Sequence, residues 1–222
     1  MTVVRSGPIR VFVVDDHVVV REGLCALIGS WPEFKVVGQA SNGLEALSKV
    51  PGLQPDVVLM DLVMPGMSGV ETIAAILQEN PDMHILVLSS FSDDEQVTQA
   101  IQAGAIGYLL KESSSNDLIQ AIFDVHQGKL VLHPVITRKI LHRLRQPTDV
   151  APVEQLLTPR EIDILKLVAQ GFSNQGIAQS LCLSEWTVTK HVSSLLSKLG
   201  LENRTQAALY ALRSGLAELV SP

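Results

Sequence analysis

The sequence predicts a doubly wound parallel α/β domain with five strands, followed by a small all-α domain. The first part of the chain alternates apolar runs of strand length with amphipathic segments of helix length, which is typical of repeated βαβ units. From about residue 154 onward the apolar residues recur with the helical period alone. The length of 222 residues also exceeds that of a usual single domain, so two domains are expected.

Five apolar runs are the predicted strands of the first domain. They lie at residues 9–14, 35–40, 57–60, 85–88 and 107–110. Helices are expected at residues 18–28, from 42, and at 68–78, 92–104 and 114–128, with capping patterns that begin at Asn42, Ser92 and Ser114. In a doubly wound sheet the carboxyl ends of all strands share one edge, so functional groups should gather there.

Asp61 stands directly after the third apolar run and before a Pro65-Gly66 turn. A buried ionised carboxylate without a partner is unstable or takes up a proton, so Asp61 should lie at the open end of its strand, among groups that compensate its charge. Polar residues also follow the other strands, namely Asp15, Asp16, Ser89 and Lys111. The topology therefore predicts one polar crevice supplied by four distant segments.

The residue types in this crevice suit phosphoryl transfer. Three carboxylates held close together repel one another unless a cation joins them, and hard oxygen ligands with open water positions favour Mg²⁺. An Asp nucleophile, a divalent ion, the ammonium of Lys111 and a hydroxyl together can accept a phosphoryl group, so Asp61 is the expected acceptor. Taken one at a time, such residues are more often turn caps or solvated groups, so the prediction depends on their convergence.

His17 follows the acidic pair and leaves two interpretations open. Its imidazole would either border the acidic crevice or only open the first helix. The apolar residues that follow it, Val18 to Val20, indicate packing and favour the second interpretation.

Charge and composition restrict the possible partners. Residues 1–130 hold 7 basic and 16 acidic residues, which argues against nucleic-acid binding by the first domain, whereas residues 151–222 hold 6 of each. No apolar run suits a membrane span or a signal peptide, so no membrane partner is expected. Cys25 and Cys182 are expected to be buried free thiols, which favours a cytoplasmic location.

These motifs resemble the receiver domain of response regulators, a flavodoxin-like fold. The resemblance covers residues 9–128 and includes the Asp pair after the first strand and the pattern Asp-x-x-Met-Pro-Gly-x-x-Gly from Asp61. It implies that a histidine kinase phosphorylates Asp61. It also implies that Asp16, Asp61 and the backbone carbonyl of Val63 bind Mg²⁺ directly, while Asp15 acts through water.

The same resemblance implies a conformational switch. In receiver domains a hydroxyl after the fourth strand, here Ser89, is paired with an aromatic residue three positions before the lysine, here Tyr108. The aromatic ring turns inward when the hydroxyl moves to the phosphoryl group. This arrangement is a two-state element whose balance depends on the charge at Asp61.

Residues 129–153 are predicted to form a linker. Pro134 can open a short helix whose apolar residues lie on one stripe, and residues 146–152 then form a flexible tether. The residues 131–150 hold 4 basic and 1 acidic residue. This basic face would contact DNA, the acidic first domain or only solvent.

Residues 154–222 are predicted to form four helices. Their expected caps are Thr158, Ser173, Ser184 and Asn203. A short second helix, a tight turn and a long amphipathic third helix, ending at Leu199, indicate a helix-turn-helix. Periodicity places the polar residues of the third helix outward, where small hydroxyls and lysines can enter a major groove; the outward residues are Trp186, Lys190, Ser193, Ser194 and Ser197.

The helical part resembles the LuxR-type helix-turn-helix domain. The resemblance spans residues 154–219 and includes Leu157-Thr158-Pro159-Arg160-Glu161 and Asn203-Arg204-Thr205. Together with the receiver motifs it identifies the chain as resembling NarL/FixJ-family response regulators, which usually bind inverted half-sites as dimers. It implies base-reading roles for Thr189, Lys190 and Ser193, and phosphate contacts by Thr187, Lys198 and Arg204.

Three features depart from this family pattern. Thr189 and Ser193 stand where relatives often carry lysine, so non-specific DNA affinity should be weak and its salt dependence shallow. Gly176 replaces a residue that is commonly Glu, which removes a capping box and weakens the second helix by roughly 1 kcal/mol. Trp186 replaces a small or charged residue on the exposed face of the third helix. It would contact sugars or methyl groups of DNA or pack against another domain, and we expect an interface because exposed Trp is often an anchor.

The motifs favour a phosphorylation-controlled transcription regulator and not an enzyme. Phosphatases of the haloacid-dehalogenase type also use an Asp nucleophile with Mg²⁺, but they need a second Asp at the position of Val63. The alternative is a regulator that acts mainly through protein contacts and whose DNA-binding domain is weak or degenerate.

Overall fold

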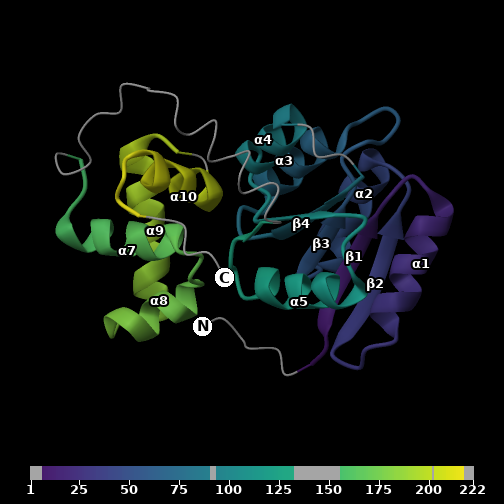
Figure 1. The fold of residues 1–222 in the computed structure, drawn as a ribbon, viewed down its shortest axis with the longest axis horizontal. Helices are drawn as coiled ribbons and strands as arrows, with labels where there is room; N and C mark the ends of the chain where they lie inside the picture. Colours follow the sequence, from purple (N-terminus) through teal and green to yellow (C-terminus); the bar gives the residue numbers. More distant parts are fainter. Residues whose placement is uncertain (1–6, 91–93, 133–155, 202, 218–222) are drawn as a thin grey trace.

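The computed structural model describes residues 7–90, 94–132, 156–201 and 203–217. Figure 1 shows a layered α/β domain, coloured purple to teal, and a helical domain beside it, coloured green to yellow. In the described part of the chain, no helix combines the length and the hydropathy needed to cross a membrane. The predicted linker helix from Pro134 and the predicted helix start at Ser92 lie outside the described residues.

The N-terminal domain is built on one parallel sheet with the strand order β2-β1-β3-β4-β5-β6. The strands are β1 (Ile9–Val14), β2 (Phe34–Ala40), β3 (Val57–Met60), β4 (His84–Ser89), β5 (Gly107–Leu110) and β6 (Val131–Leu132). The five predicted strands and the doubly wound class are confirmed. Strand β6 was not predicted, because two apolar residues carry no periodic signal.

Helices cover both faces of this sheet, so its central strands are buried on either side. The helices are α1 (Val18–Gly29), α2 (Gly43–Leu53), α3 (Gly69–Glu79), α4 (Asp94–Gln102) and α5 (Ser115–His126). Side chains of α2, α3 and α4 form one core with Phe12 and Met60 of the sheet. Side chains of α1 and α5 form the second core with Val11 and Leu59 on the opposite face (Figure 1).

The helical domain contains α7 (Pro159–Ala169), α8 (Asn174–Leu181), α9 (Glu185–Leu199) and α10 (Arg204–Arg213). Each helix begins where its predicted cap stands, because the side chains of Thr158, Ser173, Ser184 and Asn203 accept the N–H three residues further on. Helix α9 packs its apolar stripe into the domain core through Val188, Val192 and Leu195. The second and third of these helices form the predicted helix-turn-helix.

The two domains meet where α10 begins. The side-chain amides of Asn203 and Gln206 donate to the carbonyl of Gln102 at the end of α4, over 3.1 and 2.9 Å. The hydroxyl of Thr205 donates to the carbonyl of Ala105 over 3.2 Å, and this bond is buried. Figure 1 shows α10 beside α4. The sequence did not predict this contact, because caps and periodicity carry no information about which helix faces another domain.

The cysteines only partly agree with expectation. Both are free thiols, and Cys25 is half-buried, so burial raises the pKa of its thiol. Cys182 is exposed, which corrects the prediction of a buried thiol. It caps the end of α8 in the left-handed conformation, with φ of 53°, and that position turns the chain toward α9 at the surface.

Candidate functional site

An acidic crevice forms at the carboxyl ends of β1, β3 and β5. The chain leaves β1 at Asp15, β3 at Asp61 and β5 at Lys111. The ammonium Nζ of Lys111 lies 2.7 Å from Asp15 Oδ2 and 2.8 Å from Asp61 Oδ2. The structure thus joins three predicted site residues that are far apart in the sequence.

Burial and charge act on Asp61 in opposite directions. The side chain is nearly enclosed, and this desolvation raises the pKa of the Asp61 carboxyl, while the hydrogen bond from Lys111 works against the rise. Desolvation alone would lower the pKa of Lys111, but hydrogen bonds to Asp15 and Asp61 outweigh it and raise that pKa. Lys111 therefore stays charged and holds the Asp61 oxygen in place.

The carboxylates differ in how many of their oxygens are engaged. Asp15 is buried, and its two oxygens accept the Lys111 ammonium and, over 2.9 Å, the backbone N–H of His17. Asp16 is more open, with a side chain that is 25 % exposed. Asp16 is therefore more accessible than Asp15 to an ion.

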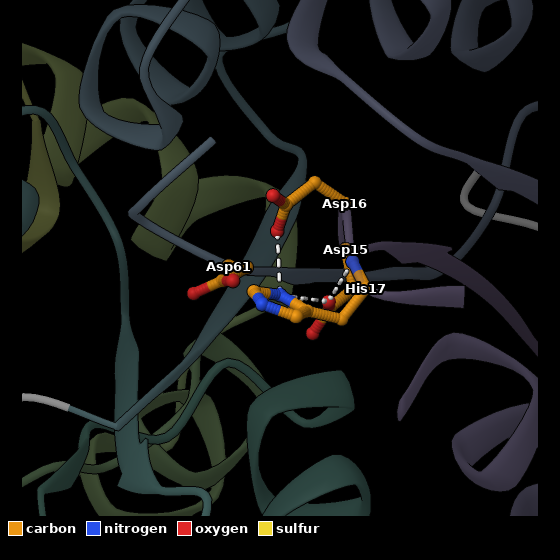
Figure 2. Close-up of side chains that lie close together, drawn as sticks. All are labelled: Asp15, Asp16, His17 and Asp61. Atoms are coloured by element: carbon orange, nitrogen blue, oxygen red, sulfur yellow. Dashed lines mark hydrogen bonds and ion pairs between the residues drawn. The ribbon is translucent and has the colours of Figure 1, made fainter. Parts of the chain in front are cut away.

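His17 lies beside the acidic group, as Figure 2 shows. Its Nδ1 is 2.8 Å from Asp16 Oδ1 and 3.6 Å from Asp15 Oδ1. The residue also stands at the N-cap of α1, without a capping bond from its side chain. The imidazole is 66 % exposed, so it borders the crevice, and the favoured interpretation of a residue that only opens the helix is incomplete.

The crevice has the ligands and the charge for a divalent cation. One potential ligand atom from each of Asp15, Asp16, His17 and Asp61 lies within 4.8 Å of the others. Three carboxylates and the ammonium of Lys111 leave two negative charges uncompensated. Carboxylate oxygens are the ligands that Mg²⁺ prefers, so the donor set fits the expected ion.

Ser89 and Tyr108 are both fully buried next to this site. Ser89 ends β4, and Tyr108 lies on β5 in register with Val87. The Tyr108 ring belongs to the core formed with α2, α3 and α4. It thus occupies the inward position that the resemblance associates with an engaged hydroxyl.

The glycine at residue 69 is required by the backbone of the acceptor. A Cβ atom there would overlap the carbonyl oxygen of Asp61 and lie 2.6 Å from the Cα of Leu62. Gly69 also donates its N–H to the carbonyl of Leu62 over 2.9 Å. The start of α3, which a capping box of Ser68 and Glu71 fixes, is therefore packed directly against the acceptor strand.

The outer face of α9 carries the predicted base-reading residues. Thr189, Lys190 and Ser193 are all exposed there. Trp186 is 68 % exposed, and Lys190 Nζ lies 5.5 Å from the centre of its ring. Thr187 is half-buried and hydrogen-bonded to Ser184 over 2.7 Å.

Two of the predicted phosphate contacts are engaged inside the protein. Lys198 Nζ pairs with the buried carboxylate of Glu161, at 2.7 Å from Oε2, and Ser194 donates to the same carboxylate over 2.8 Å. Desolvation acts to raise the pKa of the Glu161 carboxyl, but these hydrogen bonds outweigh it and lower that pKa to about 2. Ser194, predicted to point outward, is therefore half-buried. Sequence reasoning missed this network because it depends on the packing of α7 against α9.

Arg204 is held at the boundary of the two domains. Its guanidinium donates to Asn174 Oδ1 over 2.8 Å and to the carbonyl of Phe172. Burial lowers its pKa to about 10. The amide of Asn174 in turn donates to Thr189 over 3.3 Å, so hydrogen bonds connect the start of α10 with the reading face of α9.

Comparison with known proteins decides the family. The family described as response regulator receiver domain matches residues 11–123, and the family described as bacterial regulatory proteins, luxR family, matches residues 155–211. The chain is a LuxR-type response regulator. The regulator is 43 % identical over 208 residues to the transcriptional regulatory protein LiaR of Bacillus subtilis, covering 94 % of this chain and 99 % of the relative.

Other relatives agree along the whole regulator. It is 39 % identical over 210 residues to the response regulator protein VraR of Staphylococcus aureus, covering 95 % of this chain and 99 % of that one. The crystal structure of the response regulator ChrA of a heme-sensing two-component system superposes with a TM-score of 0.53 at 35 % identity, covering 95 % and 99 % of the two chains. An RcsB–DNA complex superposes with a TM-score of 0.57 at 27 % identity, covering 94 % and 99 %.

Proposed function

We propose that Mg²⁺-dependent phosphorylation of Asp61 by a histidine kinase controls DNA binding by the helical domain. The observation that carries this proposal is the position of Lys111, whose ammonium joins Asp61 and Asp15 at the carboxyl edge of the sheet. The Lys111 ammonium fixes one oxygen of Asp61, and the carboxylate can still attack phosphorus as a nucleophile.

Each residue of the crevice has a role in this proposal. Asp16, Asp61 and the carbonyl of Val63 would hold Mg²⁺, and Asp15 would support it through water and through its bond to Lys111. When bound, the ion neutralises charge that develops on the transferred phosphoryl oxygens. Lys111 supplies a second positive charge to the same oxygens. The Ser89 hydroxyl donates a hydrogen bond to the phosphoryl group, and the Tyr108 ring, which is already inward in this structure, stays in that position.

The helical domain receives the signal. Thr187, Thr189, Lys190 and Ser193 lie on one side of α9, which supports entry of this helix into a major groove. Lys198 and Arg204 are proposed phosphate contacts, and each would exchange an internal partner for DNA. The active form is proposed to be a homodimer on inverted half-sites.

The proposed domain division is a receiver at residues 9–128, a linker at 129–153 and a DNA-binding domain at 154–222. The regulator is proposed to act in the cytoplasm, where a reducing environment would keep Cys25 and Cys182 as the free thiols observed here.

Phosphorylation with acetyl phosphate tests the function without knowledge of the kinase. We expect one phosphoryl group per wild-type chain with Mg²⁺ and almost none after chelation with EDTA. Asp61→Asn should remove the signal, whereas the exposed Asp82→Asn should retain it. Full labelling of Asp61→Asn would refute Asp61 as acceptor. Equal binding of genomic fragments by labelled and unlabelled protein would refute the control of DNA binding.

A further inference from the structure

Trp186 is the most exposed large aromatic side chain among the described residues, at 68 % of its surface. Its ring lies beneath the Lys190 ammonium at 5.5 Å, a distance within the range of a cation–π contact. Within the described part of the chain, no carboxylate pairs with Lys190. This contact therefore orients a positive charge and an apolar ring together on the outer face of α9.

The hydroxyl groups of Thr189 and Ser193 on the same face donate their protons to backbone carbonyls of α9. Thr189 Oγ1 donates to the carbonyl of Glu185 over 3.1 Å, and Ser193 Oγ donates to the carbonyl of Thr189 over 3.0 Å. A hydroxyl has a single proton, so these two side chains present only lone pairs outward. Guanine and thymine offer acceptors at their major-groove edges, and these hydroxyls are poor partners for them.

Trp186 stands near the start of α9. It is the second residue of α9, and the first turns of a recognition helix are the part that reaches base edges in the major groove. Residues four apart on a helix lie about 5–6 Å from each other on the same face. That separation spans about two base steps, since successive bases rise by about 3.4 Å.

We propose that Trp186 and Lys190 act as one base-reading pair, in which the indole packs on a thymine methyl group and the ammonium donates to guanine. The two bases lie within about two base pairs of each other in the half-site. This proposal rests on the DNA binding proposed above and adds Trp186 to the reading residues. The ring orients the lysine in advance. The ring also offers an apolar surface for the C5-methyl group, which thymine alone among the four bases carries.

Selection from a random duplex library identifies the preferred half-site. Full-length protein treated with acetyl phosphate is expected to enrich sequences with a guanine close to a thymine. Trp186→Ala should lose the preference for thymine, and Lys190→Ala should lose the preference for guanine. Trp31→Ala removes the other tryptophan, on the receiver, and should give the wild-type sequence preference.

Single-atom changes in the selected DNA then test each contact. Replacing the thymine by deoxyuridine removes its methyl group and should weaken wild-type binding roughly 10-fold, with no effect on Trp186→Ala. Replacing the guanine by 7-deazaguanine should weaken the wild type and have no effect on Lys190→Ala. Circular dichroism checks that the variants are folded, which the exposure of both side chains leads us to expect.

The outcomes separate this inference from the proposed function. If wild-type protein enriches no sequence, DNA binding itself fails and the pair has no ligand to read. If the wild type enriches a site and Trp186→Ala enriches the same one, the pair is refuted while DNA binding stands. A change of oligomeric state in Trp186→Ala, with an unchanged site, would also refute it and would assign Trp186 to a protein interface.

Discussion

Asp61 illustrates how one residue depends on the groups that surround it. Burial disfavours its charged form and raises the pKa of its carboxyl, and the hydrogen bond of 2.8 Å from Lys111 acts against that rise. Position and residue type predicted this pair, because both residues end apolar strands of a parallel sheet. The side chain of His17 could not be predicted in the same way, because its direction depends on the local turn and not on periodicity.

Gly69→Ala is expected to disturb the acceptor itself. The added methyl group would overlap the Asp61 carbonyl, so the start of α3 must move away from β3. We expect a loss of about 1–3 kcal/mol in the free energy of unfolding and a slower reaction with acetyl phosphate. Urea unfolding and Phos-tag electrophoresis measure the two effects.

Gly52→Ala provides the control for that substitution. Nothing lies within 4 Å of a Cβ at this position in α2. Its stability should therefore stay the same or rise slightly, because alanine restricts the unfolded chain. Normal phosphorylation of Gly69→Ala would show that the close contact between Gly69 and Asp61 has no role in placing the acceptor.

At the scale of the elements, one buried carboxylate of α7 holds α9, the third helix of the domain, in place. Glu161 caps α7 and binds Ser194 and Lys198 of α9. The capping box was predicted from the sequence, since Thr158 and Glu161 stand three residues apart. The bonds to α9 were not predicted, because they depend on how two helices with independent periods face each other.

Glu161 should make the helical domain less stable at acidic pH. Its pKa lies at about 2 in the folded domain, below its ordinary value near 4.5, so the folded form binds fewer protons in that interval. The stabilisation is present above pH 4.5 and is lost as the pH falls toward 2. Glu161→Gln should lower stability at pH 7 by roughly 2 kcal/mol and flatten this pH dependence. Exposed Asp163→Asn should leave both unchanged in thermal unfolding.

Helix α8 should gain stability from a single methyl group. Gly176 lies inside this helix, and a Cβ there would lie 3.3 Å from a ring carbon of Phe172, which is 40 % exposed and can move. Gly176→Ala is expected to stabilise the domain by about 0.5–1 kcal/mol in urea unfolding. Gly171→Ala should destabilise it, because Gly171 has a φ of +82°. A loss of stability in Gly176→Ala would mean that Phe172 cannot move.

At the scale of the whole molecule, His84 makes the docking of the domains sensitive to pH. Burial, followed by the nearby His126 and Arg204, lowers its pKa to about 4. Arg204 belongs to the other domain, so separation would remove its charge and part of the burial and raise the pKa of His84. The separated form then binds more protons between pH 4 and 6.5, and docking weakens as the pH falls through that range.

Small-angle scattering measures this effect directly. The radius of gyration is expected to increase as the pH falls from 7 toward 4.5. His84→Gln should reduce the increase, because it removes the group that titrates. An equal increase in His84→Gln would assign the effect to other groups.

Features that depend on interactions close in sequence could be predicted, and contacts between elements distant in sequence could not. Strands, caps and the acidic crevice arise from local patterns and from the topology that βαβ units impose. The sequence therefore predicted the crevice residues Asp61 and Lys111 and the helix cap Ser184. The Glu161 network, the position of Arg204 and the contact of α10 with α4 arise between elements that are separate in sequence. No pattern within one element encodes which partner it meets.

Three hydrogen bonds between the domains depend on side chains from one domain and on the backbone of the other. In these three hydrogen bonds Asn203, Thr205 and Gln206 supply the side chains, and the receiver accepts on the backbone carbonyls of Gln102 and Ala105. Any residue type can present a carbonyl, so substitutions at the receiver side leave these bonds available as long as the chain path is kept. The receiver can thus change these positions as it diverges toward a new kinase while the three hydrogen bonds to the helical domain are kept.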